Sequence, residues 1–146
     1  MHAHRCFGAI PPQRIYNLDE TGISTMHVPS RALVPKDLKQ VGATTSAERG
    51  ETVTMVSSIN SIGNHIPPML IFPRVNLKQF ILKGAPTGSI GVVNPTGWNN
   101  EKYFLQYLEH FINYKKPSKE EPILRVFDNH ESHISLATIE WPEKLE

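Results

Sequence analysis

The segment RIYNLDETG, residues 14–22, decides the fold, because an acidic residue follows directly on a β-prone run. The run from Arg14 to Leu18 comes after two prolines and predicts a strand. The sequence Asp-Glu-Thr-Gly that follows is typical of a turn. We therefore expect Asp19 at the carboxyl end of the first strand.

A second segment, PILRVFD at residues 122–128, has the same form: a short apolar strand that ends at an aspartate, Asp128. A turn should follow, and then a helix over residues 134–139 with Ser132 as its cap. If the two strands are parallel neighbours, their carboxyl ends coincide, and acids 109 residues apart in sequence (128 minus 19) come within a few ångströms. Parallel strands need a crossover connection, and a predicted helix lies just before the second strand.

That helix is the clearest element in the sequence. Asn99 or Asn100 can cap it, and Glu101 suits its first turn. Aromatic and aliphatic residues recur at helical spacing and predict one packed face, to which we also assign Trp98, and helix packing explains these aromatic residues better than base stacking does. The stripe consists of Tyr103, Phe104, Tyr107, Leu108, Phe111 and Ile112.

Upstream, residues 52–60 and 65–72 predict a hairpin with a turn at residues 61–64. Pro67 and Pro68 lack backbone donors, so the second strand should be an edge strand or be bent there. We expect mostly loop at residues 73–98, and a loop at residues 28–50 with a short strand at residues 40–43.

Composition fits one globular, loop-rich domain of 146 residues with 12 prolines. The net charge is only +1, so any contact with nucleic acid has to be local. The single cysteine, Cys6, cannot form an internal disulfide, and the N-terminal residues do not resemble a signal peptide. No apolar run approaches the roughly 20 residues that span a bilayer. We expect an intracellular protein without a membrane segment.

Two adjacent carboxylates repel each other unless a cation neutralises them or one is protonated. Carboxylate oxygens suit Mg²⁺ or Mn²⁺, and a pair of such ions can promote in-line attack on a phosphodiester. The alternative is that Asp19 shapes a turn and Asp128 caps a helix. Spacing alone favours that alternative, because aspartate is common at turns.

Four long blocks change this balance, because nearly the whole sequence resembles the DDE superfamily endonuclease domain of pogo-like and jerky-like transposases, which are related to mariner elements. The blocks are IYNLDETGIST, VPKDLKQVGATTSAERGETVTMVSSINSIGNHIPPMLIFPR, GAPTGSIGVVNPTGWNNEKYFLQYLEHFI and LRVFDNHESHISL. The resemblance makes Asp19 and Asp128 the first two acids of the catalytic triad, each a ligand of Mg²⁺ or Mn²⁺ in a two-metal site.

The resemblance also implies an α/β fold, the ribonuclease-H-like mixed sheet with flanking helices, here expected to be incomplete at the C-terminus. Residues 11–146 would form a partial catalytic core and residues 1–10 a short extension. The family's third acid lies further downstream than Glu146, and its DNA-reading helix-turn-helix region lies upstream. We expect a nuclear or intracellular protein with DNA as partner, whose ancestral activity was strand cleavage and transfer and which is inactive in this form. A non-catalytic nucleic-acid-binding or protein-interaction module, and a gene remnant without a stable product, are the alternatives.

Other polar residues give weaker signals. His130 and His133 have the spacing of a zinc pair but lack further ligands, so they more plausibly support Asp128 or meet substrate. Glu20 should point to the face opposite Asp19. Arg74, Lys78 and Lys83 form a small basic group that favours a solvated loop over a phosphate contact. Glu131, Glu140 or Glu143 would replace the third acid only in an unusual arrangement.

Overall fold

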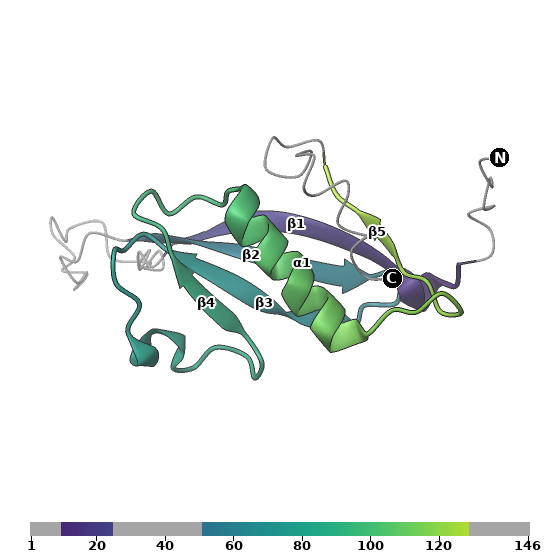
Figure 1. Cartoon of the computed structure of the whole chain (residues 1–146). Coiled ribbons are helices and arrows are strands. Elements are labelled where there is room, and N and C mark those ends of the chain that lie inside the picture. Colours follow the sequence, from purple (N-terminus) through teal and green to yellow (C-terminus); the bar gives the residue numbers. More distant parts are fainter. Residues whose placement is uncertain (1–9, 25–50, 129–146) are drawn as a thin grey trace, which may run out of the picture.

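One helix covers one face of a five-stranded sheet in the computed structural model, which describes residues 10–24 and 51–128 (Figure 1). The strand order is β4-β3-β2-β1-β5. The pairs β1–β2 and β2–β3 are antiparallel, whereas β1–β5 and β3–β4 are parallel. The predicted α/β mixed sheet is therefore confirmed. The elements are η2 (Pro12–Arg14), β1 (Ile15–Ser24), β2 (Thr52–Asn60), β3 (His65–Phe72), η3 (Gln79–Leu82), β4 (Ile90–Val93), α1 (Glu101–Lys115) and β5 (Leu124–Val126).

Strand β1 is longer than its sequence predicts, and the expectation that it ends at Asp19 is wrong. It pairs residue for residue with β2 from Tyr16↔Asn60 to Ser24↔Thr52. This ladder keeps the turn-like Asp-Glu-Thr-Gly segment extended, since pairing satisfies its backbone donors and acceptors. A Cβ on Gly22 would lie 3.1 Å from the Thr52 side chain, so this glycine permits a close approach of β2 and makes no turn.

The β2–β3 hairpin is confirmed, including its turn. The Asn60 side chain organises that turn, because its Oδ1 accepts hydrogen bonds from the backbone N–H groups of Ile62 and Asn64. Strand β3 is an interior strand, so the expectation of an edge was wrong, but the expected irregularity is present. Between the pairs Val56↔Met69 and Ser58↔Ile66 the register shifts, and the two prolines fall inside that bulge, where no ladder donor is needed.

Helix α1 begins as predicted, with the Asn100 side chain accepting a hydrogen bond from the backbone N–H of Tyr103. Its apolar face packs on the sheet, and the ring of Phe111 meets that of Tyr16 edge-on at 5.1 Å. This packing buries one continuous core across β1, β2, β3, β4 and α1. Its fully buried members include Tyr16, Leu18, Val56, Ile66, Met69, Ile71, Phe104, Tyr107, Leu108 and Phe111.

The segment between β3 and α1 is more regular than predicted. It contains η3 and the short strand β4, which pairs in parallel with β3. Four residues that include a glycine give too little periodicity to identify such a strand. The strand expected at residues 40–43 and the helix expected at residues 134–139 lie outside the described residues.

Candidate active site

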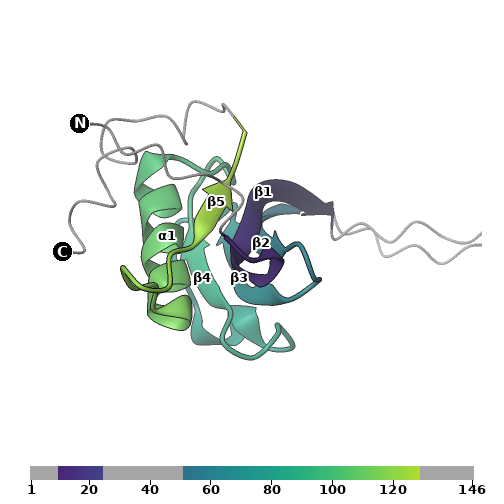
Figure 2. The same ribbon diagram turned by 90° about the vertical axis from the view of Figure 1, so that its right-hand side faces the viewer.

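Strands β1 and β5 are parallel neighbours with a constant offset. Ile15, Tyr16 and Asn17 pair with Leu124, Arg125 and Val126, and each pair differs by 109 (124 minus 15, for example). The side view shows β5 running beside β1 (Figure 2). The two predicted acids have the same offset, 128 minus 19, so the register extended by two residues aligns Asp19 with Asp128.

In both strands, the residue before the aspartate contacts the helix side of the sheet and the aspartate itself is exposed. Leu18 is buried under the helix, whereas its neighbour Asp19 is exposed. On the other strand the ring of Phe127 lies 5.8 Å from that of Phe104 in α1, and the next residue, Asp128, is exposed. Successive residues of a strand face opposite sides of the sheet. By this alternation the Asp19 carboxylate belongs to the face that α1 does not cover, and Asp128 belongs to the same face if the alternation of β5 continues two residues past Val126.

Asp19 lies in the middle of β1 instead of at its end. Its Oδ1 accepts a hydrogen bond of 2.7 Å from the backbone N–H of Glu20, which fixes one carboxylate oxygen. Asp128 follows the end of β5, as predicted, at the second residue after Val126.

A third ligand does not join these acids within residues 10–24 and 51–128, where no group of three His, Cys, Asp or Glu side chains could hold a metal ion. The other candidates lie outside the described residues, so zinc binding and a replacement third acid stay predictions. These candidates are His130, Glu131, His133, Glu140 and Glu143.

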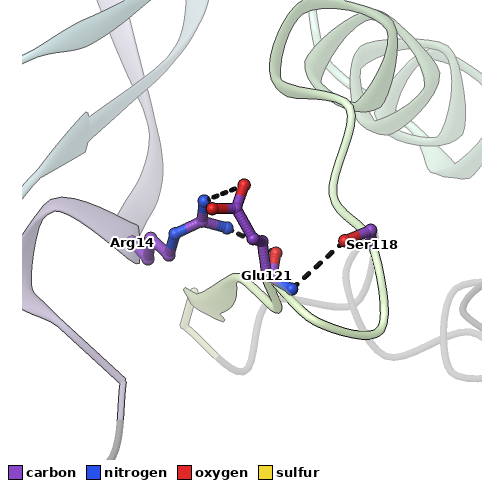
Figure 3. Close-up of polar contacts among 3 residues, drawn as sticks. All are labelled: Arg14, Ser118 and Glu121. Carbon is purple, nitrogen blue, oxygen red and sulfur yellow. Dashed lines mark hydrogen bonds and ion pairs between the residues drawn. The ribbon is translucent and has the colours of Figure 1, made fainter.

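An ion pair ties the chain before β5 to the start of β1 (Figure 3). The Arg14 guanidinium donates to the backbone carbonyl of Glu121 and also pairs with its carboxylate. The Ser118 hydroxyl accepts a hydrogen bond from the Glu121 backbone N–H at 3.1 Å. Arg14 and Glu121 are 107 residues apart in the sequence, so no short-range sequence pattern could predict this contact. It joins the segment before β5 to the residue that precedes β1.

Strand β5 also carries a charge on its covered side. Burial lowers the pKa of the Arg125 guanidinium, and among the described residues its Nη1 has no hydrogen-bond partner. Arg125 pairs with Tyr16, so it belongs to the face opposite the two aspartates.

Glu20 lies on the helix side of β1, as predicted, where its carboxylate accepts a hydrogen bond from the Asn99 side chain. Beside it lies a cleft of about 250 Å³. The cleft is lined by residues 20–22 of β1, by Thr52 and Thr54 of β2, and by residues 96–98 before α1. Trp98 is 72% exposed at this cleft, so the prediction that it packs with the helix is wrong. The helical stripe starts only at Tyr103, beyond a loop that carries Trp98 outward.

The basic group after β3 behaves mainly as a solvated loop. Arg74 pairs with Glu51 at 2.9 Å, and Lys78 lies over the exposed ring of Phe80. Two of the three basic side chains, Arg74 and Lys78, thus contact neighbouring residues of the chain. These contacts favour the solvated-loop alternative over a phosphate contact.

Similar folds occur in solved structures of a DNA transposase. The Mos1 transposase paired-end complex with left transposon end superposes with a TM-score of 0.55 at 16% identity, over 92% of this chain and 34% of that chain. The Mos1 strand transfer complex gives 0.54 at 17% identity, over 92% and 33%. The chain therefore spans about a third of the length of the Mos1 chains.

Sequence comparison adds one curated relative. The MFS-type transporter clz9 of Cochliobolus lunatus is 29% identical over 150 residues, which is 94% of this chain and 15% of that protein. No protein-family model matches the sequence. Within the described residues, no helix has the length and apolarity needed to cross a bilayer. The expected likeness to DDE transposases is confirmed in the architecture: the chain has the α/β, ribonuclease-H-like fold of the Mos1 transposase.

Proposed function

We propose that residues 11–146 are part of a transposase-derived DDE endonuclease domain, whose ancestral reaction was metal-dependent cleavage and transfer of DNA strands. One observation carries the proposal. The offset of 109 that pairs β1 with β5 is also the offset between Asp19 and Asp128. Turn or cap aspartates would have no reason to match the register of two strands. DNA is then the partner, and a nuclear or intracellular location follows from that substrate.

The two aspartates suit Mg²⁺ or Mn²⁺ as ligands. Both are exposed, and both supply the hard oxygen atoms that these ions prefer. Magnesium is commonly held by only one or two carboxylates, with water and substrate phosphate filling its remaining positions. When bound, a pair of such ions activates the attacking oxygen and stabilises the leaving one.

The chain's own contribution is to hold these carboxylates in place. The Glu20 backbone N–H donates a hydrogen bond to one carboxylate oxygen of Asp19. The ladder with β2 keeps the backbone of β1 extended on both sides of this residue. The Arg14–Glu121 contact fixes the approach of β5 and hence of Asp128. Fixed ligands matter because a shift of about 1 Å in the reacting groups can cost ~100-fold in rate.

The alternative is a non-catalytic module that keeps the fold and binds nucleic acid or protein. The observation that favours it is the lack of a third acidic ligand beside Asp19 and Asp128 within residues 10–24 and 51–128. We accordingly expect this chain to bind metal weakly and to cut DNA poorly.

Metal titration tests the shared site. Binding of Mn²⁺ is followed by electron paramagnetic resonance for the unchanged chain, Asp19→Asn and Asp128→Asn. The matched control is Glu109→Gln, which removes an exposed carboxylate from α1. The unchanged chain and the control should bind equally, while each aspartate variant should lose the site. Equal binding by all four proteins would remove both aspartates from any metal site.

A further inference from the structure

The cleft beside Trp98 is a second candidate site on the described surface, separate from the two aspartates. We infer that it binds an unpaired nucleobase of a DNA strand, stacked on the Trp98 indole; this inference rests on the proposed function. The cleft has a volume of about 250 Å³, and Trp98 forms part of its wall.

The loop that carries Trp98 is held firmly, although the indole itself is exposed. The Asn94 side chain donates to the Trp98 carbonyl at 2.6 Å, and the Trp98 backbone N–H donates to the Thr96 hydroxyl at 3.3 Å. Below them the Thr54 hydroxyl donates to the Gly97 carbonyl at 2.7 Å. A large aromatic ring that is mostly exposed on a firmly held backbone is a ready stacking surface, since the loop loses little freedom when a flat ligand covers the ring.

The chemistry of the cleft favours a neutral ring over a phosphate. The Glu20 carboxylate lines it, and no lysine or arginine is among the described residues that do so. Four threonines line the cleft, and two of them, Thr52 and Thr96, add hydroxyl groups that either donate or accept. Such groups suit the polar edge of any base, whereas the carboxylate repels a phosphate. Stacking on an indole is equally tolerant of base identity.

The position of the cleft links it to the proposed active site. Its β1 residues, 20–22, directly follow Asp19, and three residues of strand span about 10 Å. That distance corresponds to roughly three stacked nucleotides at 3.4 Å each. Glu20 and Asp19 lie on opposite faces of β1, so a strand that reaches both the cleft and the aspartates has to cross from one face of the sheet to the other.

The test uses Trp98 as its own reporter. The chain has two tryptophans, so the Trp141→Phe form leaves Trp98 as the single indole. Without metal, this protein is titrated with a duplex bearing a short single-stranded thymidine tail, with the same duplex bearing an abasic tail, and with a blunt duplex. Only the first should quench the indole emission strongly. Anisotropy measures binding of the tail to variants of the form with both tryptophans. Trp98→Ala should weaken tail binding about 10-fold or more, whereas Trp98→Phe should retain most of the affinity. Tyr114→Ala removes another exposed aromatic ring and serves as the control, so its affinity for the tail should be unchanged.

Several outcomes would overturn the inference: equal quenching by the abasic tail, unchanged binding in Trp98→Ala, or quenching by an unrelated peptide and not by the tail. The last result would make the cleft a peptide site. Circular dichroism of each variant confirms that it is folded. Tail binding is measured without metal, so a failed Mn²⁺ titration with retained quenching refutes the proposed function alone. A normal titration without quenching refutes the base site alone.

Discussion

Ser58 of β2 and Tyr107 of α1 share a hydrogen bond between two hydroxyl groups in the core, where the two residues are 2% and 0% exposed. This hydrogen bond joins the helix to β2, the central strand of the sheet. Tyr107→Phe leaves the Ser58 hydroxyl buried without this partner and should cost about 1–3 kcal/mol of unfolding free energy. Urea unfolding followed by circular dichroism measures the loss.

The same pair allows a double-mutant cycle. Ser58→Ala should cost a similar amount, and the double variant should cost less than the sum, because it removes both polar groups together. Strictly additive losses would show that the hydrogen bond contributes nothing to stability.

Stability should also fall at alkaline pH because of Tyr107. Burial raises the pKa of this phenol to about 12, and the hydrogen bond from Ser58 offsets only part of that rise. In the unfolded chain a tyrosine ionises near pH 10, so the folded state binds its proton more tightly. The stabilisation is complete below pH 10 and is lost as the pH rises through 12, by about 2–3 kcal/mol in total. Unfolding free energies at pH 9 to 12 should therefore fall less steeply for Tyr107→Phe, and parallel curves would contradict this assignment.

The Arg14–Glu121 contact should matter more for register than for stability. Its side chains are 25% and 68% exposed, and exposed ion pairs typically contribute about 0–1 kcal/mol. Glu121→Gln should therefore lower the unfolding free energy only slightly, and by less at high salt. If the contact holds β5 in register, the same variant should weaken Mn²⁺ binding measurably. A large salt-independent loss of stability would instead indicate a packing role.

Gly97 is expected to be the most sensitive position in the loop that carries Trp98. Its φ is +75°, and an added Cβ would lie 3.2 Å from the Cβ of Pro73. Gly97→Ala should cost about 1–2 kcal/mol from backbone strain alone, with the contact adding to it. Gly63→Ala is the matched control, since its φ is +90° with no atom within 4 Å of the new Cβ. Equal losses in the two variants would show that the Pro73 contact is harmless.

The helix and the hairpin could be predicted from the sequence, because short-range patterns determine both of them. The stripe from Tyr103 to Phe111 gave α1, and the turn after Asn60 gave the hairpin. The full length of β1 was missed, because its ladder with β2 depends on residues some 30 to 45 positions away, which keep a turn-like segment extended. Trp98 was misassigned because it precedes the helix cap, in a loop whose direction the helical spacing does not determine.

The pair of aspartates shows both the strength and the limit of sequence reasoning. Two strands that each lead to an acid made parallel neighbours one possibility, and the resemblance to DDE transposases made it the expectation; the β1–β5 pairing confirms that the strands are parallel neighbours. The face of each acid could be inferred only from the strand register, the burial of Leu18 and the contact of the partly buried Phe127 with Phe104, all of which depend on packing under α1. Whether Asp19 and Asp128 share a metal ion stays a prediction.

The last prediction concerns catalysis by the 146-residue chain. In-line attack on a phosphodiester needs ions held on both the attacking and the leaving oxygen. Asp19 and Asp128 are the two proposed ligands, and within the described residues no third His, Cys, Asp or Glu joins them in a group that could hold a metal ion. The net charge of +1 adds no general attraction for DNA. We therefore expect no useful nicking of supercoiled plasmid with Mn²⁺, whether the chain is unchanged or carries Asp19→Ala or Asp128→Ala.

The informative comparison is between these three proteins at equal concentration, with Glu109→Gln as the folded control. Weak nicking that persists in both aspartate variants would indicate a contaminating nuclease, because a site built on both carboxylates cannot survive the loss of either. Robust nicking by the unchanged chain and the control, abolished in both variants, would contradict the prediction. It would mean that a further ligand completes the site from outside residues 10–24 and 51–128, and substitution of Glu131, Glu140 and Glu143 in turn would then identify it.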